Sequence, residues 1–317
     1  MQQIKGNAIP SRRQNLFYRW FGKNSLWQLW LIAFVPVLFV FVFNYIPMGG
    51  ILIAFKKYSP RKGIFGSSWV GLKHFQQLFK SPVFTMILTN TLILSLMNLL
   101  FGFPFPIMLA LGFNEIRNAR VKKTLQTITF APYFISTVVM VSIVYQVFSY
   151  HYGVVNAALK AFGRDAVNWF ALPSFFRPAY VFSGIWQGAG YGSIIYMAAL
   201  ASVDPTLYEA AEIDGASRFQ RMLHIDIPSI SSVIVITLIM NTGSILSVGF
   251  EKAYLMQNDL NYRTSEIIST YVYKVGIQEA QYSFSTAVGL FNSVVNCATL
   301  LLVNFIVSKI DRESSMF

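Results

Sequence analysis

Long apolar runs separated by short polar segments dominate the chain. Six stretches contain no Asp, Glu, Lys or Arg, and they cover residues 24–55, 81–114, 124–159, 178–203, 227–250 and 280–308. Each stretch is longer than the roughly 20 residues that an α-helix needs to cross a hydrocarbon core. Lipid offers no partners to backbone N–H and C=O groups, and strands of a membrane barrel would be shorter and would alternate. The pattern therefore predicts membrane-spanning helices.

The predicted fold is all-α: a polytopic membrane bundle of six transmembrane helices, built as a single transmembrane domain over residues 1–317. The predicted spans cover roughly residues 26–55, 83–113, 124–150, 177–203, 228–250 and 283–310. An even number of spans puts both termini on the same side of the membrane. Lys and Arg usually mark cytoplasmic loops, but here they divide almost evenly between the two sides. Charge alone therefore leaves the orientation open.

Composition narrows the class of protein further. The chain is 55% hydrophobic and 12% charged, whereas soluble domains carry about 25% charged residues. This excludes a disordered chain and argues against an ordinary soluble enzyme. The net charge of +12 would suit nucleic-acid binding, but the cations lie in short loops between apolar runs. Contact with anionic membrane lipid, and no nucleic-acid partner, is the simpler interpretation.

The fourth predicted span carries glycines at a regular spacing. Gly184, Gly188 and Gly192 are four residues apart, with Gly190 between them. Glycines at this spacing form one smooth helix face that another helix can approach closely. The approaching helix could belong to this chain or to a partner subunit, and the sequence alone leaves both alternatives open.

The segment 204–228 has strong helix punctuation. Asp204 is suited to cap a helix that begins at Pro205, and Gly215 can end that helix in a left-handed conformation. Ser217 and Gln220 fit a capping box that opens a second helix. The expected result is a rigid knob of two short helices at a membrane surface. Such a knob suits docking to another protein, and its residues match no catalytic or metal-binding pattern.

The same segment resembles a known motif. Glu209-Ala210-Ala211 is followed at fixed spacing by Gly215, Ile225 and Ile227-Pro228. This series is similar to the EAA motif of permease subunits of type I, binding-protein-dependent ABC importers, with Ile227 where that family usually has Leu. Further stretches, at 44–50, 69–75 and 90–91, look like the N-terminal half of type I sugar permeases. Residues 270–276, 282–283 and 287–291 look like the branch that imports complex oligosaccharides, which includes alginate permeases.

The resemblance implies a non-catalytic permease subunit of an ATP-driven importer of oligosaccharides or polysaccharide fragments. Substrate would pass from an extracytoplasmic substrate-binding protein through a heterodimeric permease by alternating access. The implied partners are a second permease subunit and an ATPase dimer, and ATP and Mg would bind to that ATPase, with no cofactor on this chain. The implied location is the bacterial cytoplasmic membrane, with both termini and the 204–228 loop in the cytoplasm. Residues that match the motif would carry coupling to the ATPase: Glu209, Ala210, Ala211, Gly215, Ile225 and Pro228.

Candidates for the substrate path are aromatic, amide and hydroxyl side chains in the fourth and fifth predicted spans. They are Trp186, Gln187, Tyr191, Asn241 and Ser244. Packing between helices is the alternative role for each of them. No catalytic or metal site is expected, because the three histidines, His74, His151 and His224, lie in separate loops.

Two other functions compete with the importer. An ion-coupled secondary transporter of a small solute usually places ionisable side chains inside its spans, and no charged residue lies well inside any predicted span. A membrane-embedded enzyme would need a nucleophile with a base, or clustered metal ligands, at membrane depth. Copurification separates these alternatives, because only the importer requires an ATPase, a second permease and an external binding protein.

Overall fold

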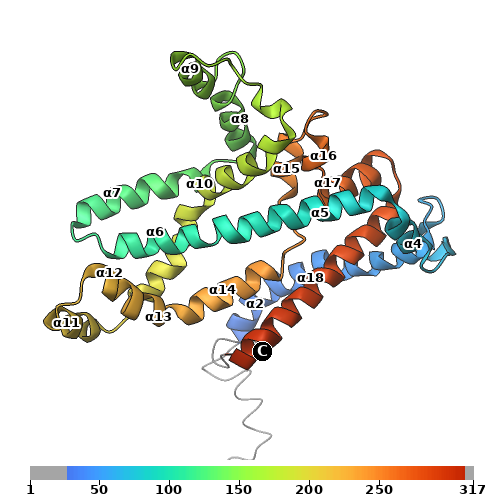
Figure 1. The fold of residues 1–317 in the computed structure, drawn as a ribbon. Coiled ribbons are helices and arrows are strands. Elements are labelled where there is room, and N and C mark those ends of the chain that lie inside the picture. The colour runs from blue at the N-terminus through green and yellow to red at the C-terminus, as the bar shows by residue number, and fades with distance from the viewer. Residues whose placement is uncertain (1–26, 311–317) are drawn as a thin grey trace, which may run out of the picture.

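A computed structural model describes residues 27–310 (Figure 1). The predicted cytoplasmic termini and the first residue of the first predicted span lie outside this range. Within it the chain is helical except for loops and one two-stranded antiparallel hairpin, in which Lys56 of β1 (Lys56–Lys57) pairs with Trp69 of β2 (Ser68–Trp69). The described chain is therefore the mostly helical protein that the sequence predicts.

The first half of the chain forms one long apolar helix, a segment of short helices and a strand hairpin, and a second long helix with its return. Its helical elements are α2 (Trp27–Val40), η1 (Phe41–Tyr45), η2 (Ile46–Phe55), α3 (Gly63–Gly66), α4 (Lys73–Lys80), α5 (Pro82–Met97), η3 (Asn98–Gly102), α6 (Pro104–Asn114), α7 (Ala119–Phe130), η4 (Ala131–Phe134), α8 (Thr137–Val147), α9 (Val154–Ala161) and η5 (Trp169–Ala171).

The second half contains a central helix, the predicted knob, a cluster of short helices and a long C-terminal helix. Its elements are α10 (Pro173–Leu200), α11 (Pro205–Ile213), α12 (Arg218–Arg221), η6 (Met222–Asp226), α13 (Ile227–Ser229), α14 (Ser231–Thr242), α15 (Phe250–Met256), α16 (Tyr262–Ser265), α17 (Ile268–Tyr273), η7 (Lys274–Gln278) and α18 (Tyr282–Ile310).

Three helices in the described range are long and apolar enough to cross a membrane: Leu29–Phe55, Pro82–Asn114 and Tyr282–Lys309. Two bent helix pairs would raise the number to five if each pair forms one span. Helix α10 has 28 residues, which is sufficient length. Its glycines and polar side chains lower its hydropathy, and it is not among the helices that are both long enough and apolar enough to span.

The third predicted span, expected as one continuous helix over 124–150, is broken in the structure. The helical segments Ala119–Phe134 and Thr137–Val147 meet at an angle of 103°. Pro132, which lacks a backbone N–H, lies in the 3₁₀ turn η4, and Ser136 then caps α8 by accepting a hydrogen bond from the Val139 N–H at 3.4 Å. Sequence hydropathy does not detect this break, because both arms are apolar.

The fifth predicted span, over 228–250, is shorter than expected. The pair Arg218–Ser229 and Ser231–Thr242 bends by 62° near Ile230, and α14 ends at Thr242. The following backbone leaves the helix and is held by α18, where Asn296 Oδ1 accepts a hydrogen bond from the Leu246 N–H at 2.9 Å. The uncharged residues after Thr242 therefore form an irregular connection between α14 and α15.

Helix α10 lies at the centre and packs against α6, α7, α8, η3, α14 and α15. A Cβ atom on Gly190 would lie 2.0 Å from the Thr129 carbonyl oxygen of α7, and one on Gly192 would lie 3.3 Å from Pro106 of α6. These positions must therefore be small for the helices to approach. Packing inside this chain, one of the two alternatives for the glycine face, accounts for both residues.

The knob and helix α4 lie at opposite ends of the molecule. Figure 1 shows α11 and α12 at one end of the long helical rod formed by α5, η3 and α6, and α4 at the other end. One continuous element therefore runs between these two ends.

Candidate functional site

The first helix of the 204–228 loop begins as the sequence predicts. Asp204 Oδ1 accepts a hydrogen bond from the Thr206 N–H at 2.9 Å, and Pro205 is the first residue of α11. This bond lowers the pKa of Asp204 because the ionised carboxylate is the better acceptor. The start of α11 is thus fixed by local chemistry, without help from neighbouring spans.

The turn between α11 and α12 also follows the prediction. Gly215 has φ +74°, the left-handed region that favours glycine, and the Ala216 N–H donates to the Ala211 carbonyl at 2.9 Å. The Ser217 N–H donates to Gln220 Oε1 at 2.8 Å, and the Gln220 N–H donates to Ser217 Oγ at 3.3 Å. This reciprocal capping box opens α12, as expected.

A buried carboxylate anchors the knob to the bundle, and sequence analysis did not single it out. Asp226 is fully buried, and the Tyr208 hydroxyl of α11 donates a hydrogen bond to its Oδ1. Asn114 Nδ2, at the end of α6, donates to the same oxygen at 3.4 Å. Burial, followed by the bond to Asp226, raises the pKa of Tyr208 to about 12. An acid placed directly before an apolar run is the signal that could have identified this anchor.

The outward surface of the knob carries motif residues and apolar side chains. Glu209, Ala210, Gly215 and Pro228 are exposed, whereas Ala211 and Ile225 are half-buried. Beside them, large apolar side chains are exposed to 86% and 64% at Ile213 and Phe219 respectively. Exposed apolar side chains beside a charged residue are typical of a surface that docks to another protein.

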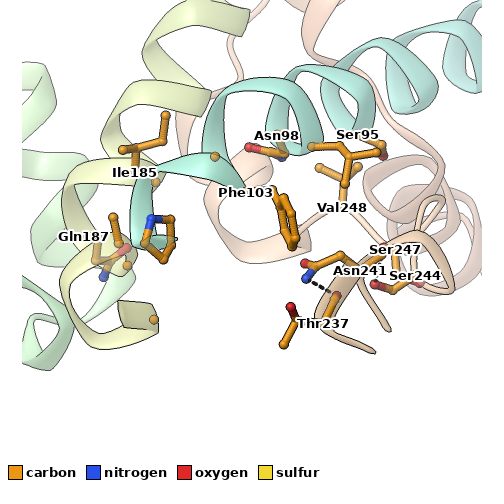
Figure 2. A pocket seen from close by; sticks show the side chains of 18 of the residues that line it. Ser95, Asn98, Phe103, Ile185, Gln187, Thr237, Asn241, Ser244, Ser247 and Val248 are labelled. Atoms are coloured by element: carbon orange, nitrogen blue, oxygen red, sulfur yellow. Dashed lines mark hydrogen bonds between the residues drawn. The ribbon is translucent and has the colours of Figure 1, made fainter. Parts of the chain in front are cut away.

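A cavity of about 580 Å³ lies beside α10, where α5, η3, α6, α14 and the segment after α14 meet. This volume is within the range of small-molecule sites, about 300–1,000 Å³. Figure 2 shows Phe103 between the amide side chains of Asn98 and Asn241. Gly184, Gly188 and Gly192 all line the same cavity. The glycine face therefore opens α10 to this space as well as to neighbouring helices.

Three of the five substrate-path candidates line this cavity: Gln187, Asn241 and Ser244. Gln187 Nε2 donates to the Ile135 carbonyl at 2.8 Å, and Asn241 Nδ2 donates to the Thr237 carbonyl at 2.7 Å. Each amide thus bonds the backbone through its nitrogen, with neither amide oxygen bonded in these contacts.

The structure does not bring the other two candidates to the cavity. Trp186 lines a separate apolar pocket between α8 and α10, together with Ile143 and Phe182. Tyr191 stacks on Tyr133, with 3.8 Å between the ring centroids. Trp186 is one residue from Gln187 and therefore points about 100° away around the helix. Tyr191 is one turn beyond Gln187 on the same side of α10, where its ring packs on η4 and does not line the cavity.

One cation in the cavity lies just beyond the fifth predicted span, and sequence analysis did not name it as a candidate. Lys252 of α15 is only 9% exposed and lines the cavity next to Gly184 and Tyr180. Its Nζ donates to the Tyr180 carbonyl and lies 4.4 Å from the centroid of the Tyr180 ring. The sequence could not place it here, because the early end of α14 is not visible in the hydropathy pattern.

A buried acidic residue lies between the short helices α16 and α17. Glu266 is fully buried, and its Oε2 lies 2.6 Å from Lys274 Nζ and accepts a hydrogen bond from Gln257 at 2.9 Å. Thr270 donates to the other carboxylate oxygen at 3.0 Å. This carboxylate is paired and hydrogen-bonded, as buried charges in stable structures are. Among residues 27–310 no group of three His, Cys, Asp or Glu is arranged to hold a metal ion.

Comparison with known proteins agrees with this architecture. The family model described as "Binding-protein-dependent transport system inner membrane component" matches residues 102–312. Protein LplB of Bacillus subtilis (strain 168) is 44% identical over 291 residues, which are 92% of this chain and 91% of that protein. The polygalacturonan/rhamnogalacturonan transport system permease protein YteP of the same organism is 44% identical over 285 residues, covering 90% of this chain and 89% of that protein.

A solved structure is similar over nearly the whole chain. It is described as a bacterial ABC transporter involved in the import of the acidic polysaccharide alginate. It has a TM-score of 0.85 and 39% sequence identity, and it covers 95% of this chain and 100% of the matched chain. The motif in the 204–228 loop, the helical bundle and these similarities lead to one conclusion. The chain belongs to the inner membrane component family of binding-protein-dependent transport systems, the permeases of ABC importers.

Proposed function

We propose that the chain is one half of a heterodimeric permease that imports oligosaccharides or polysaccharide fragments by alternating access. The observation that carries this proposal is the knob of α11 and α12. It presents Glu209, Ala210 and Gly215 on an exposed surface and is anchored to the bundle through Tyr208 and Asp226. A docking surface held rigidly to membrane helices can transmit force from a partner. The names of relatives, which include polygalacturonan and alginate systems, support a saccharide substrate.

In this proposal the knob docks on an ATPase subunit in the cytoplasm. The side chain of Glu209 would pair with a basic group of the ATPase, and the small side chain of Ala210 would allow close approach. ATP and Mg would bind to the ATPase dimer, and this chain would contribute no catalytic group. Both termini would be cytoplasmic, with α4 and the strand hairpin at the outer face. A similar alginate transporter has been solved with an oligosaccharide-bound periplasmic protein, which supports an external binding protein as the donor.

Six spans are part of the same proposal. The first, second and sixth would be the three long apolar helices, and the third and fifth would be the two bent pairs. Helix α10 would be the fourth, since its 28 residues correspond to about 42 Å at 1.5 Å per residue. Its low hydropathy is expected of a helix that lines a cavity and contacts other helices on most sides.

Copurification followed by reconstitution tests the proposal. An affinity-tagged chain extracted from native membranes should bring down an ATPase and a second, similar permease. Vesicles containing this complex should take up oligosaccharide only with internal ATP and an external binding protein. A matched complex carrying Glu209→Arg should assemble its membrane part but lose uptake. Uptake by the chain alone, driven by an ion gradient and insensitive to ATP, would refute the proposal.

A further inference from the structure

Lys252 is unusual among the buried polar residues, because it is a cation that faces the central cavity. It extends from α15 toward the middle of α10, where it lies against Tyr180 and Gly184. Charged residues are rarely buried unless they are paired. A buried lysine without an acidic partner therefore calls for a physical reason in the groups around it.

The ammonium group of Lys252 has unused bonding capacity. An ammonium carries three donors, and the structure gives Lys252 Nζ one hydrogen bond, to the Tyr180 carbonyl, and a contact with the Tyr180 ring. Within the described part of the chain, no carboxylate oxygen lies within 4.0 Å of this nitrogen. Lys274, by contrast, has Glu266 at 2.6 Å. Lys252 is thus a basic side chain with no acid of residues 27–310 beside it.

The backbone next to Lys252 is shaped to admit this group. A Cβ atom on Gly184 would lie 2.9 Å from Lys252 Nζ, which is closer than real side chains approach. Glycine at position 184 therefore leaves the space that the ammonium occupies. One turn further along α10, a Cβ atom on Gly188 would meet nothing within 4 Å, so the cavity stays open beside the cation.

The rest of the cavity wall has the chemistry of a saccharide site. Ser95, Asn98, Asn241 and Ser247 present hydroxyl and amide groups, and Phe103 presents an aromatic ring. Amides and hydroxyls can exchange hydrogen bonds with sugar hydroxyls, and aromatic rings provide apolar faces. A small inorganic anion would leave most of a cavity of about 580 Å³ unused. The geometry therefore favours an organic ligand that combines hydroxyl groups with one negative charge.

We propose that Lys252, against Tyr180, forms an anion-binding subsite of the cavity, which takes the carboxylate of a uronic acid unit in the transported oligosaccharide. This inference rests on the proposed function and adds the substrate class to it. One donor of the ammonium stays on the Tyr180 carbonyl, and the others bond the carboxylate. The bound acid supplies the counter-charge that the chain lacks at this position.

Direct binding to the assembled permease and ATPase complex, without the external binding protein, tests the subsite. The probes are a labelled tetragalacturonate and the same tetrasaccharide with its carboxyl groups reduced to alcohols. The wild-type complex should bind the acid at least about tenfold more tightly than the neutral form, because hydrogen bonds to charged groups are worth more than neutral ones. Lys252→Met should remove this preference, and Lys252→Arg should keep most of it.

Two further variants keep the test decisive if Lys252→Met does not assemble. Gly184→Ala displaces the ammonium and should lower the ratio of acid to neutral affinity severalfold. Gly112→Ala, in α6 outside the cavity lining and with open space around its Cβ position, should leave the ratio unchanged. An unchanged ratio in both Lys252→Met and Gly184→Ala, or equal wild-type affinity for the two probes, would overturn the subsite. If the complex took up the carboxyl-reduced tetrasaccharide with ATP but not the acid, the subsite would also be overturned, and the proposed function would stand. Absence of ATP-dependent uptake of any oligosaccharide would instead overturn the proposed function.

Discussion

The hydrogen bond between Tyr208 and Asp226 is one of the links between the knob and the bundle, and its removal has a calculable effect. Tyr208→Phe deletes only the hydroxyl and leaves the ring in place. Asp226 would then retain Asn114 at 3.4 Å as its one remaining side-chain partner in the described structure. Its second oxygen, Oδ2, already lacks a hydrogen bond among the described residues. The variant therefore leaves a fully buried carboxylate almost without compensation.

The size of the effect follows from the charge of the acceptor. Hydrogen bonds to charged groups contribute about 1.5–3 kcal/mol, and an unsatisfied buried group loses a similar amount. Removing the bond should lower the free energy of local opening of the knob by this amount. The population of the open knob then rises roughly tenfold to a hundredfold.

Limited trypsin digestion measures this opening at Arg218 and Arg221, which lie in the second helix of the knob. The cleavage rate follows the open population when closing is faster than cleavage, so it should rise by the same factor. Stimulation of ATP hydrolysis by substrate should fall in parallel. Tyr152→Phe is the matched control, because Tyr152 is 90% exposed and should show neither change. An unaltered cleavage rate in Tyr208→Phe would refute the reasoning that this bond anchors the knob.

Three further predictions concern close packing and turn chemistry. Gly190→Ala places a Cβ atom against the Thr129 carbonyl and should destabilise the complex by about 1–3 kcal/mol, seen as a lower Tm, whereas Gly188→Ala should not. Gly215→Pro is incompatible with φ +74°, and it should abolish substrate-stimulated ATP hydrolysis while the membrane helices keep their circular dichroism. The folded-state pKa of Asp204 is lowered from 3.8, so its cap stabilises the knob above that pH and is lost as the pH falls through the lowered value. The rate at which pepsin cleaves the knob should therefore rise as the pH falls below 3.8. Asp204→Asn, whose side chain does not titrate, should show a weaker rise over the same pH range.

Local signals in the sequence predicted the knob well, because its structure depends on neighbouring residues. The cap at Asp204, the left-handed turn at Gly215 and the box at Ser217 are each made by contacts within five residues. Such contacts can be inferred from residue type and spacing. The anchoring of the knob could not be inferred in this way, because Tyr208 and Asp226 are 18 residues apart.

Hydropathy predicted where apolar segments lie but not where they bend or end. The breaks near Pro132 and Ile230 lie inside uncharged runs, and a run of apolar residues has the same hydropathy whether or not it is straight. For the same reason Lys252 was not among the candidates for the cavity, since the chain after Thr242 turns back toward α10. Of the aromatic candidates, Trp186 faces away from the cavity because of its position around α10, and Tyr191 is instead stacked on Tyr133, a contact that hydropathy does not reveal.

Three helices, α6, α10 and α14, run from the cavity to the knob. Helix α10 lines the cavity and ends at Leu200, four residues before the Asp204 cap. Helix α14 lines it on another side and begins shortly after Asp226, and α6 runs from the cavity to Asn114, which bonds the same carboxylate. A small core that includes Leu200 and Ile230 holds these three helices together near the knob. Because a packed core moves as a unit, a partner that displaces the knob must also displace three walls of the cavity. In the proposed importer, coupling would therefore require no long side-chain relay, since the same helices carry the proposed docking surface and line the cavity.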